Sequence, residues 1–222
     1  MIYILHLETS TKVCSVALSC DGRQLAIKED LSNEYSHAEN LTSYIQDVLN
    51  QSKISLKELS AVSVASGPGS YTGLRIGVST AKGLCYALEI PLIAVDSLIS
   101  LATQAKEKHQ DINLCALIDA RRMEEFNGFY NSNLESLKPI SADIIIKDSY
   151  KEFEPFVYFG DGANKLEEIW KDRNCTIDSS IYSSATGQIP LAYEKFNKKQ
   201  FEDVAYFEPF YLKDFIGLKK NN

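Results

Sequence analysis

The chain has 222 residues, of which 23 are basic and 30 acidic, so its net charge is −7, and 45% of its residues are hydrophobic. This composition is that of an ordinary globular protein and excludes a disordered or fibrous chain. The acidic balance argues against a nucleic-acid groove as the main feature, because such grooves have a basic face, and no apolar run reaches the roughly 18 residues of a membrane span.

In the first half of the chain, a group of strands precedes alternating strands and helices. Asp21-Gly22 is a strong hairpin signal, and Ser36 with Glu39 fits a capping box that opens a helix. The expected elements are strands at 2–7, 13–18, 24–29, 59–65 and 92–95 and helices at 36–50, 72–88 and 97–108.

The second half repeats the alternation less clearly. Expected strands lie at 113–118, 125–130, 144–146 and 156–159, and expected helices at 164–171 and 185–199. The polar stretch 106–111 is the best boundary, so we predict an N-terminal lobe at 1–108 and a smaller C-terminal lobe at 109–222. The aromatic closing segment, about 204–222, is expected to pack back on the first lobe. Together these patterns predict an α/β fold with mixed sheets.

Both the N-terminal residues and the cysteines point to a reducing compartment. The sequence MIYILHLETS has no basic region and no small-residue cleavage site, so it reads as a strand rather than a signal peptide. The five cysteines form no CxxC pair and lie mostly among apolar neighbours, which favours small core residues in the cytoplasm. We therefore expect a cytoplasmic protein.

Five of the eleven glycines lie between Gly67 and Gly83. Gly67 and Gly69 stand between a predicted strand and a predicted helix, where backbone N–H groups can bind phosphate. The spacing GxGxxxG is one residue too long for the dinucleotide fingerprint, and no lysine follows as in a P-loop. A tight turn without a ligand is the alternative interpretation.

Gly73 and Gly77 lie inside the predicted helix 72–88, on a face of mostly small residues with Ile76 and Thr80. Each interior glycine costs about 1 kcal/mol relative to alanine, so close approach of another backbone is the expected compensation. That backbone could belong to the chain's own 36–50 helix or to a helix of another subunit, and the pattern leaves both open.

Catalytic and metal signatures are missing from the sequence. The three histidines His6, His37 and His109 are far apart and belong to no HxxH or HExxH pattern, so no zinc ligand set is expected. There is no GxSxG nucleophile motif either. Asp119, which precedes Arg121-Arg122, could orient a substrate, but a structural Asp–Arg pair is the simpler interpretation.

One loop has the residues of a vestigial phosphate site. It runs Glu8-Thr9-Ser10-Thr11 between the first two strands, where an acidic residue followed by hydroxyls could hold Mg²⁺-nucleotide phosphates. A hydroxyl-rich turn is the alternative. Such a site needs a second phosphate loop, for which Gly160-Asp161-Gly162 is a faint candidate, and a base pocket, for which nothing is found.

Several segments together resemble the TsaB (YeaZ) family. They are LETSTKVCSVAL at 7–18, YSHAENL at 35–41, ASGPGSYTGLRIGVSTAKGL at 65–84, IPLIAVDSL at 90–98, IDARRMEEF at 118–126 and FEPFYLKDF at 207–215. GPGSYTGLRIG is the most specific of these. The resemblance implies a short actin/Hsp70-like (ASKHA) two-lobe fold. It also implies a role in forming N6-threonylcarbamoyladenosine (t6A) at position 37 of tRNAs that read ANN codons.

By the same resemblance, the chain is a non-catalytic partner of its larger paralogue TsaD, with TsaE joining. ATP and metal are then expected on TsaD, no intrinsic cofactor is expected here, and tRNA contact is indirect or unknown. Glu8 stands where actin-like folds usually carry aspartate, which weakens a nucleotide role. The alternatives are a reduced ATPase or peptidase-like enzyme, and a homodimer when the chain is alone.

Family interfaces use the two helices that follow the first strands, and this favours another subunit as the helix partner. The residues expected at that interface are His37, Glu39, Asn40, Leu41, Ile45, Tyr71, Thr72, Gly73, Arg75, Ile76, Gly77 and Thr80.

Overall fold

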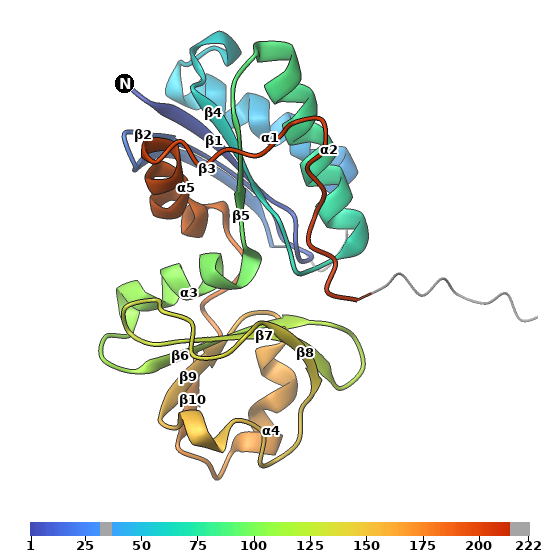
Figure 1. Cartoon of the computed structure of the whole chain (residues 1–222), viewed down its shortest axis with the longest axis vertical. Helices are drawn as coiled ribbons and strands as arrows, with labels where there is room; N and C mark the ends of the chain where they lie inside the picture. Colours follow the sequence, from blue (N-terminus) through green and yellow to red (C-terminus); the bar gives the residue numbers. More distant parts are fainter. Residues whose placement is uncertain (32–36, 214–222) are drawn as a thin grey trace, which may run out of the picture.

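The computed structural model describes residues 1–31 and 37–213, and for residues 37 and 38 it describes the backbone only. Two five-stranded sheets form two lobes, one above the other in Figure 1, with helix α3 (Ser97–Lys108) between them. Within the described ranges, no helix is long and apolar enough to cross a membrane.

The first sheet has the strand order β3-β2-β1-β4-β5. Its strands are β1 (Tyr3–Glu8), β2 (Cys14–Cys20), β3 (Arg23–Asp30), β4 (Ala61–Ala65) and β5 (Leu92–Val95). β1 pairs antiparallel with β2 and parallel with β4, so it lies at the centre of the sheet. The hairpin turn has Asp21 and Gly22 at positive φ, as the Asp-Gly signal predicts.

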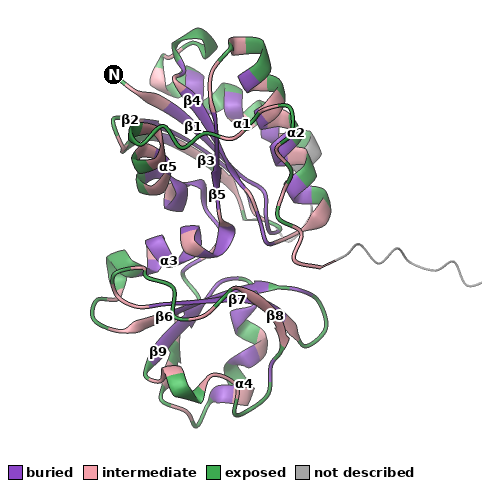
Figure 2. Cartoon of the chain, in the orientation of Figure 1, coloured by how far each residue is buried: buried purple, intermediate pink, exposed green. Residues whose placement is uncertain are grey.

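Helices cover both faces of this sheet. α1 (His37–Ser52) and α2 (Tyr71–Leu88) pack on one face, with Leu41, Ile45 and Val78 in the shared core. α5 (Gln188–Asn197) packs on the other face against β4 and β5. Figure 2 shows the resulting buried layer along the central strands.

The second sheet repeats the connectivity of the first. Its order is β10-β9-β6-β7-β8, with β6 (Asn113–Asp119), β7 (Glu124–Tyr130), β8 (Ser141–Ile144), β9 (Phe156–Phe159) and β10 (Cys175–Ile177). β6 pairs antiparallel with β7 and parallel with β9, as β1 does with β2 and β4. The β1–β2 loop therefore corresponds to the β6–β7 hairpin, and each lobe has one glycine loop after its fourth strand.

The helices break this repeat. α3 covers one face of the second sheet, and η3 (Ala163–Leu166) with α4 (Glu167–Trp170) covers the other, where Trp170 fills the core. Between β8 and β9 the described chain forms only the short helix η2 (Lys151–Phe153), where the first lobe has the sixteen-residue α1. Among the described residues, a long helix pair is thus a property of the first lobe.

The predicted helices and strands agree with the structure in the first lobe, and the differences lie after residue 140. β10 was not predicted, the strand predicted at 144–146 is β8 three residues earlier, and the helix predicted at 185–199 is η4 (Ala185–Gly187) followed by α5. The capping box at Ser36 lies outside the described residues.

The predicted boundary of the second lobe needs correction at its C-terminal side. α5 lies on the first lobe, although the prediction placed it with the second, and residues 202–211 pack back on the first lobe, as predicted for the closing segment from about residue 204. Glu202 bridges to Leu92 of β5, and Phe210 N donates to the Ser66 carbonyl at 2.7 Å. The part of the closing segment beyond residue 213 lies outside the described residues.

Candidate functional site

The β1–β2 loop of the chain itself packs against the glycines at the start of α2. A Cβ atom at Gly73 would lie 2.1 Å from the carbonyl oxygen of Thr9, and one at Gly77 would lie 2.3 Å from Thr9 Oγ1. A Cβ at Gly69 would lie 2.3 Å from the carbonyl oxygen of Ser10. The backbone that approaches these glycines is therefore neither the 36–50 helix nor another subunit, and Gly73 and Gly77 are not surface residues.

The acidic residue of this loop is bonded inside the chain. Glu8 is 1% exposed; its Oε1 accepts from Ser10 N at 2.8 Å and its Oε2 from Gln188 Nε2 of α5 at 3.2 Å. Burial raises the pKa of Glu8, although the bonds from Ser10 and Gln188 oppose it. The hydroxyls of Thr9 and Ser10 are buried and Thr11 is 3% exposed, so this predicted phosphate loop faces the interior.

The N-terminus of α2 is occupied as well. Ser70 N donates to the Ser10 carbonyl at 2.6 Å, and the Ser70 side chain accepts from Gly73 N at 3.3 Å as the N-cap. Gly67 has a φ of 103° and lies against the Phe210 carbonyl, where a Cβ atom would be 2.5 Å away. Gly67 and Gly69 thus form the tight turn of the alternative interpretation, with their space filled by the chain itself.

The corresponding loop of the second lobe is filled by a charged side chain. A Cβ atom at Gly162 would lie 1.9 Å from Oε2 of Glu125, which is fully buried. Lys165 Nζ pairs with Glu125 Oε1 at 2.5 Å and with Asp119 Oδ1 at 2.7 Å. Burial raises the pKa of Glu125 to about 8 although Lys165 opposes it. The carboxyl group therefore fills the space at Gly162 that a phosphate would need.

Asp119 does not form the predicted side-chain pair with an arginine. Its Oδ1 accepts from the backbone N–H of Arg121 at 2.6 Å and pairs with Lys165. Nothing in the sequence marks Lys165 or Glu125, since single charged residues of this kind are common in polar helices and at strand ends.

No metal centre is present among the residues that the structure describes, where no group of three or more His, Cys, Asp or Glu side chains could hold an ion. His6 is buried and its Nε2 lies 2.8 Å from Ser19 Oγ, while His109 pairs with Asp178 at 2.8 Å. The side chain of His37 lies outside the described residues.

The predicted interface residues divide into core and surface. Leu41 and Ile45 are 1% and 5% exposed and belong to the core between α1, α2 and the sheet, because they lie on the apolar stripe of α1. With Gly73 and Gly77 they cannot contact a partner. The partly or fully exposed members are Glu39, Asn40, Tyr71, Thr72, Arg75, Ile76 and Thr80.

Small residues continue the exposed face along α2. Ile76, Thr80, Gly83 and Ala87 follow one another at intervals of three or four residues, so they share one side of the helix. Thr80 Oγ1 donates back to the Ile76 carbonyl at 2.9 Å, and a Cβ atom at Gly83 would meet nothing within 4 Å. This small-residue stripe leaves room for another helix to approach.

The closing segment lies along the flank of α2. Lys82 Nζ donates to the carbonyls of Ala205 and Phe207 at 3.1 and 3.0 Å. The Arg75 guanidinium stacks 4.1 Å from the Tyr71 ring centroid, and its Nε donates to Tyr211 Oη at 3.3 Å.

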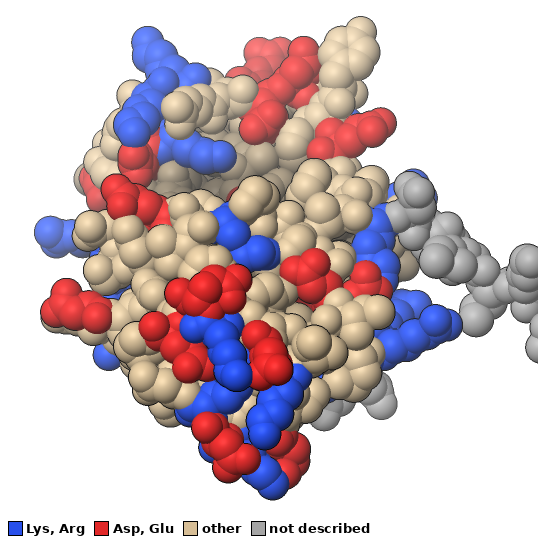
Figure 3. Space-filling model, turned by 60° about the horizontal axis from the view of Figure 1, so that its bottom comes forward, with Lys and Arg blue, Asp and Glu red and all other residues tan. Residues whose placement is uncertain are grey.

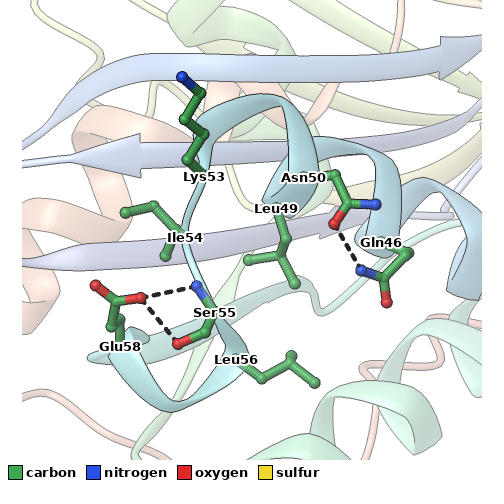
Figure 4. A pocket seen from close by; sticks show the side chains of 8 residues that line it. All are labelled: Gln46, Leu49, Asn50, Lys53, Ile54, Ser55, Leu56 and Glu58. Atoms are coloured by element: carbon green, nitrogen blue, oxygen red, sulfur yellow. Dashed lines mark hydrogen bonds between the residues drawn. The ribbon is translucent and has the colours of Figure 1, made fainter.

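A shallow hollow of about 460 Å³ lies beyond the C-terminal end of α1 (Figure 4). Several of its polar side chains are bonded to one another: Glu58 Oε2 accepts from Ser55 Oγ at 2.8 Å, and Gln46 Nε2 donates to Asn50 Oδ1 at 3.0 Å.

Comparison with known proteins gives the same architecture. The family model "TsaD: tRNA N6-adenosine threonylcarbamoyltransferase" matches residues 32–214. The chain is 30% identical to "tRNA threonylcarbamoyladenosine biosynthesis protein TsaB" of Escherichia coli (strain K12), covering 98% of this chain and 97% of that protein. The solved structure "YeaZ from Pseudomonas aeruginosa" is 27% identical, with a TM-score of 0.80, covering 96% of this chain and 100% of that one.

A second class of relative matches a smaller part. The chain is 33% identical over 109 residues to "tRNA N6-adenosine threonylcarbamoyltransferase" of Staphylococcus aureus (strain Newman), covering 42% of this chain and 32% of that protein. The predicted fold class, a two-lobe α/β fold with mixed sheets flanked by helices, is confirmed.

Proposed function

The chain belongs to the TsaB family, and on that premise we propose that it is a non-catalytic subunit of the machinery that forms t6A in tRNA. In this proposal it binds the threonylcarbamoyltransferase TsaD and supports it, with TsaE joining the assembly. The product is t6A at position 37 of tRNAs that read ANN codons, and the nucleotide and metal reside on TsaD.

The observation that carries the proposal is the closure of both glycine loops by the chain's own atoms. Thr9 and Ser10 occupy the space at the N-terminus of α2, and the Glu125 carboxylate lies against Gly162. A nucleotide that used these loops would have to displace a buried backbone segment in one lobe and a buried carboxylate in the other. This supports a role in binding a partner over a role in catalysis.

The face of α1 and α2 is the docking surface in this proposal. Apart from Tyr71 and Ile76, its exposed members are polar or small, and the stripe Ile76, Thr80, Gly83 and Ala87 permits close approach of a helix. The Staphylococcus aureus transferase is similar to 42% of this chain. A paralogue with related helices can form a pseudo-twofold bundle, in which both partners contribute the same kind of surface.

The test is to block the stripe without disturbing the chain's own fold. Gly83→Arg adds a large side chain where the isolated chain has open space, and it also removes a helix glycine. We expect the variant to fold as the parent does and to bind TsaD at least tenfold more weakly, a loss of about 1.4 kcal/mol. Size-exclusion chromatography and titration calorimetry with purified TsaD measure this.

The matched control is Asn174→Arg, which adds the same side chain at an exposed position of the second lobe. It should bind TsaD as the parent does. Independent elution of the parent chain and TsaD at micromolar concentration would count against the proposal, and equal binding by Gly83→Arg would place the interface elsewhere. A parent chain that self-associates and dissociates with Gly83→Arg would instead indicate a homodimer through this face.

The competing enzyme hypothesis makes a different prediction. A reduced ATPase should bind Mg·ATP as a lone chain at sub-millimolar concentration and lose that binding in Thr9→Ala. The proposal expects no such binding and no threonylcarbamoyl transfer by the lone chain.

A further inference from the structure

The tip of the β6–β7 hairpin has an unusual backbone. Arg121 and Arg122 both have positive φ, 72° and 58°, within a three-residue loop between Ala120 and Glu124. Hairpin loops usually place glycine or asparagine at such positions, because a Cβ atom disfavours the left-handed region. Two consecutive arginines there are strained, and neither is needed to form the turn.

Hydrogen bonds from Lys165 and to Asp119 fix the backbone of this tip. Lys165 Nζ donates to the Arg122 carbonyl at 2.9 Å and to Asp119 Oδ1 at 2.7 Å. Asp119 Oδ1 in turn accepts from Arg121 N at 2.6 Å. The backbone of the tip is therefore fixed, while both arginine side chains are exposed.

The charges around the tip are paired, but those of the two arginines are not. Lys165 pairs with Asp119 and Glu125, and Lys213 pairs with Glu124. No carboxylate in the described chain forms an ion pair with either arginine guanidinium. In Figure 3, basic side chains gather at the right-hand edge, the side on which Figure 1 shows the tip of this hairpin. The tip therefore presents two adjacent unpaired cations on a chain that is acidic as a whole.

We propose that Arg121 and Arg122 form a contact for the phosphate backbone of the RNA substrate. The inference rests on the proposed function, which brings a tRNA to the assembly. Guanidinium groups present a planar fork of donors that matches phosphate oxygens, and phosphate contacts position an RNA without reading its sequence. The strained backbone then has a reason, because it projects two adjacent cations from a rigid base.

Two adjacent exposed guanidinium groups match the charge of a phosphate backbone, and exposed apolar side chains lie beside them. Met123 is 43% accessible, and Ile144 and Ile146, in the segment that pairs beside it, are 71% and 62% accessible. Because protein interfaces also use arginine and apolar side chains, a protein partner at this tip is the outcome that the experiment must separate from RNA. Phosphate contacts give a salt dependence in proportion to their number, so the assignment can be measured.

The experiment uses the assembly of this chain with TsaD and transcribed tRNA, and measures affinity across a range of salt concentration. Arg121→Asn with Arg122→Gly supplies the residues that a left-handed turn prefers and removes both charges. We expect about tenfold weaker tRNA binding near 100 mM salt, and a plot of log affinity against log salt that is shallower by about 1.4 to 1.8. We also expect a higher melting temperature for the variant chain.

The control is Arg23→Gln with Lys57→Gln, which removes the same charge from exposed positions of the first lobe and should leave affinity and slope unchanged. Equal binding and an equal slope for the hairpin variant overturn the inference while the proposed function stands. Loss of TsaD binding by the hairpin variant also overturns it, since the tip would then lie in a protein interface. A parent chain that does not assemble with TsaD overturns the proposed function and this inference together.

Discussion

In the first lobe, the β1–β2 loop is held by neutral close packing: Thr9 and Ser10 lie directly on the glycines of α2. In the second lobe, the corresponding β6–β7 hairpin is held by charge, through Lys165 between Asp119 and Glu125. The two sheets share one connectivity, so the two loops occupy corresponding places and can be compared directly. The same closed arrangement of loops is reached by two kinds of interaction, and each kind predicts its own response to mutation and to pH.

The largest expected effect tests the neutral packing of the first lobe. Gly73→Ala places a Cβ atom 2.1 Å from the Thr9 carbonyl oxygen, and a backbone atom cannot move aside as a flexible side chain can. Overpacking of this kind destabilises by about 3 kcal/mol, which lowers the melting temperature of a chain this size by about 6–12 °C. Thermal unfolding followed by circular dichroism measures it.

Gly83→Ala is the matched control in the same helix. Its Cβ atom meets nothing within 4 Å, so the gain in helix propensity, about 1 kcal/mol, should raise the melting temperature by about 2–4 °C. If both variants shifted the melting temperature equally, the close packing of Thr9 on Gly73 would be wrong, and with it the first half of the comparison.

The next effect tests the charged closure of the second lobe. Lys165→Met leaves the fully buried Glu125 without its cation, and we expect a loss of about 2 kcal/mol at pH 8. The loss should shrink at pH 5.5, where Glu125 takes up a proton. Lys171→Met removes only an exposed pair with Glu168 and should change the melting temperature little. A pH-independent loss in Lys165→Met would show that packing, not charge, holds this hairpin.

This contrast also explains what could be predicted from the sequence. Where another segment packs directly against a helix backbone, only glycine leaves enough room. The closure of the first lobe is therefore visible in the sequence as Gly73 and Gly77, although the sequence does not show which segment approaches them. Closure by Glu125 and Lys165 uses common charged residues, and the glycine that makes room for it, Gly162, gave only a faint phosphate-loop candidate in the sequence. Strand β10 escaped prediction and β8 was predicted three residues too late, because both are short, partly exposed edge strands with little hydrophobic alternation.

A smaller effect concerns alkaline pH. Burial raises the pKa of Glu125 to about 8, above its unfolded value, so the folded state holds the proton more tightly and stability is lost as pH rises through 8. Glu125→Gln cannot titrate, and its melting temperature relative to the parent should therefore increase between pH 6 and pH 8.5. Burial also raises the pKa of Glu8, which is present in both proteins, so the melting temperature of Glu125→Gln still falls somewhat as pH rises. Parallel curves for the two proteins would contradict the assignment.

The smallest expected effect lies at acid pH and belongs to the first lobe. His6 is fully buried in β1, and burial lowers its pKa to about 3. The unfolded chain binds a proton below about pH 6.5 while the folded chain does not, so stability falls as pH drops from 6.5 toward 3. His6→Gln keeps a donor for Ser19 Oγ but cannot titrate, so between pH 6.5 and 5 its melting temperature should fall by about 2–4 °C less than that of the parent. An equal acid slope in both proteins would mean that His6 is accessible to protons in the folded chain, which would break the picture of a first lobe closed by neutral packing.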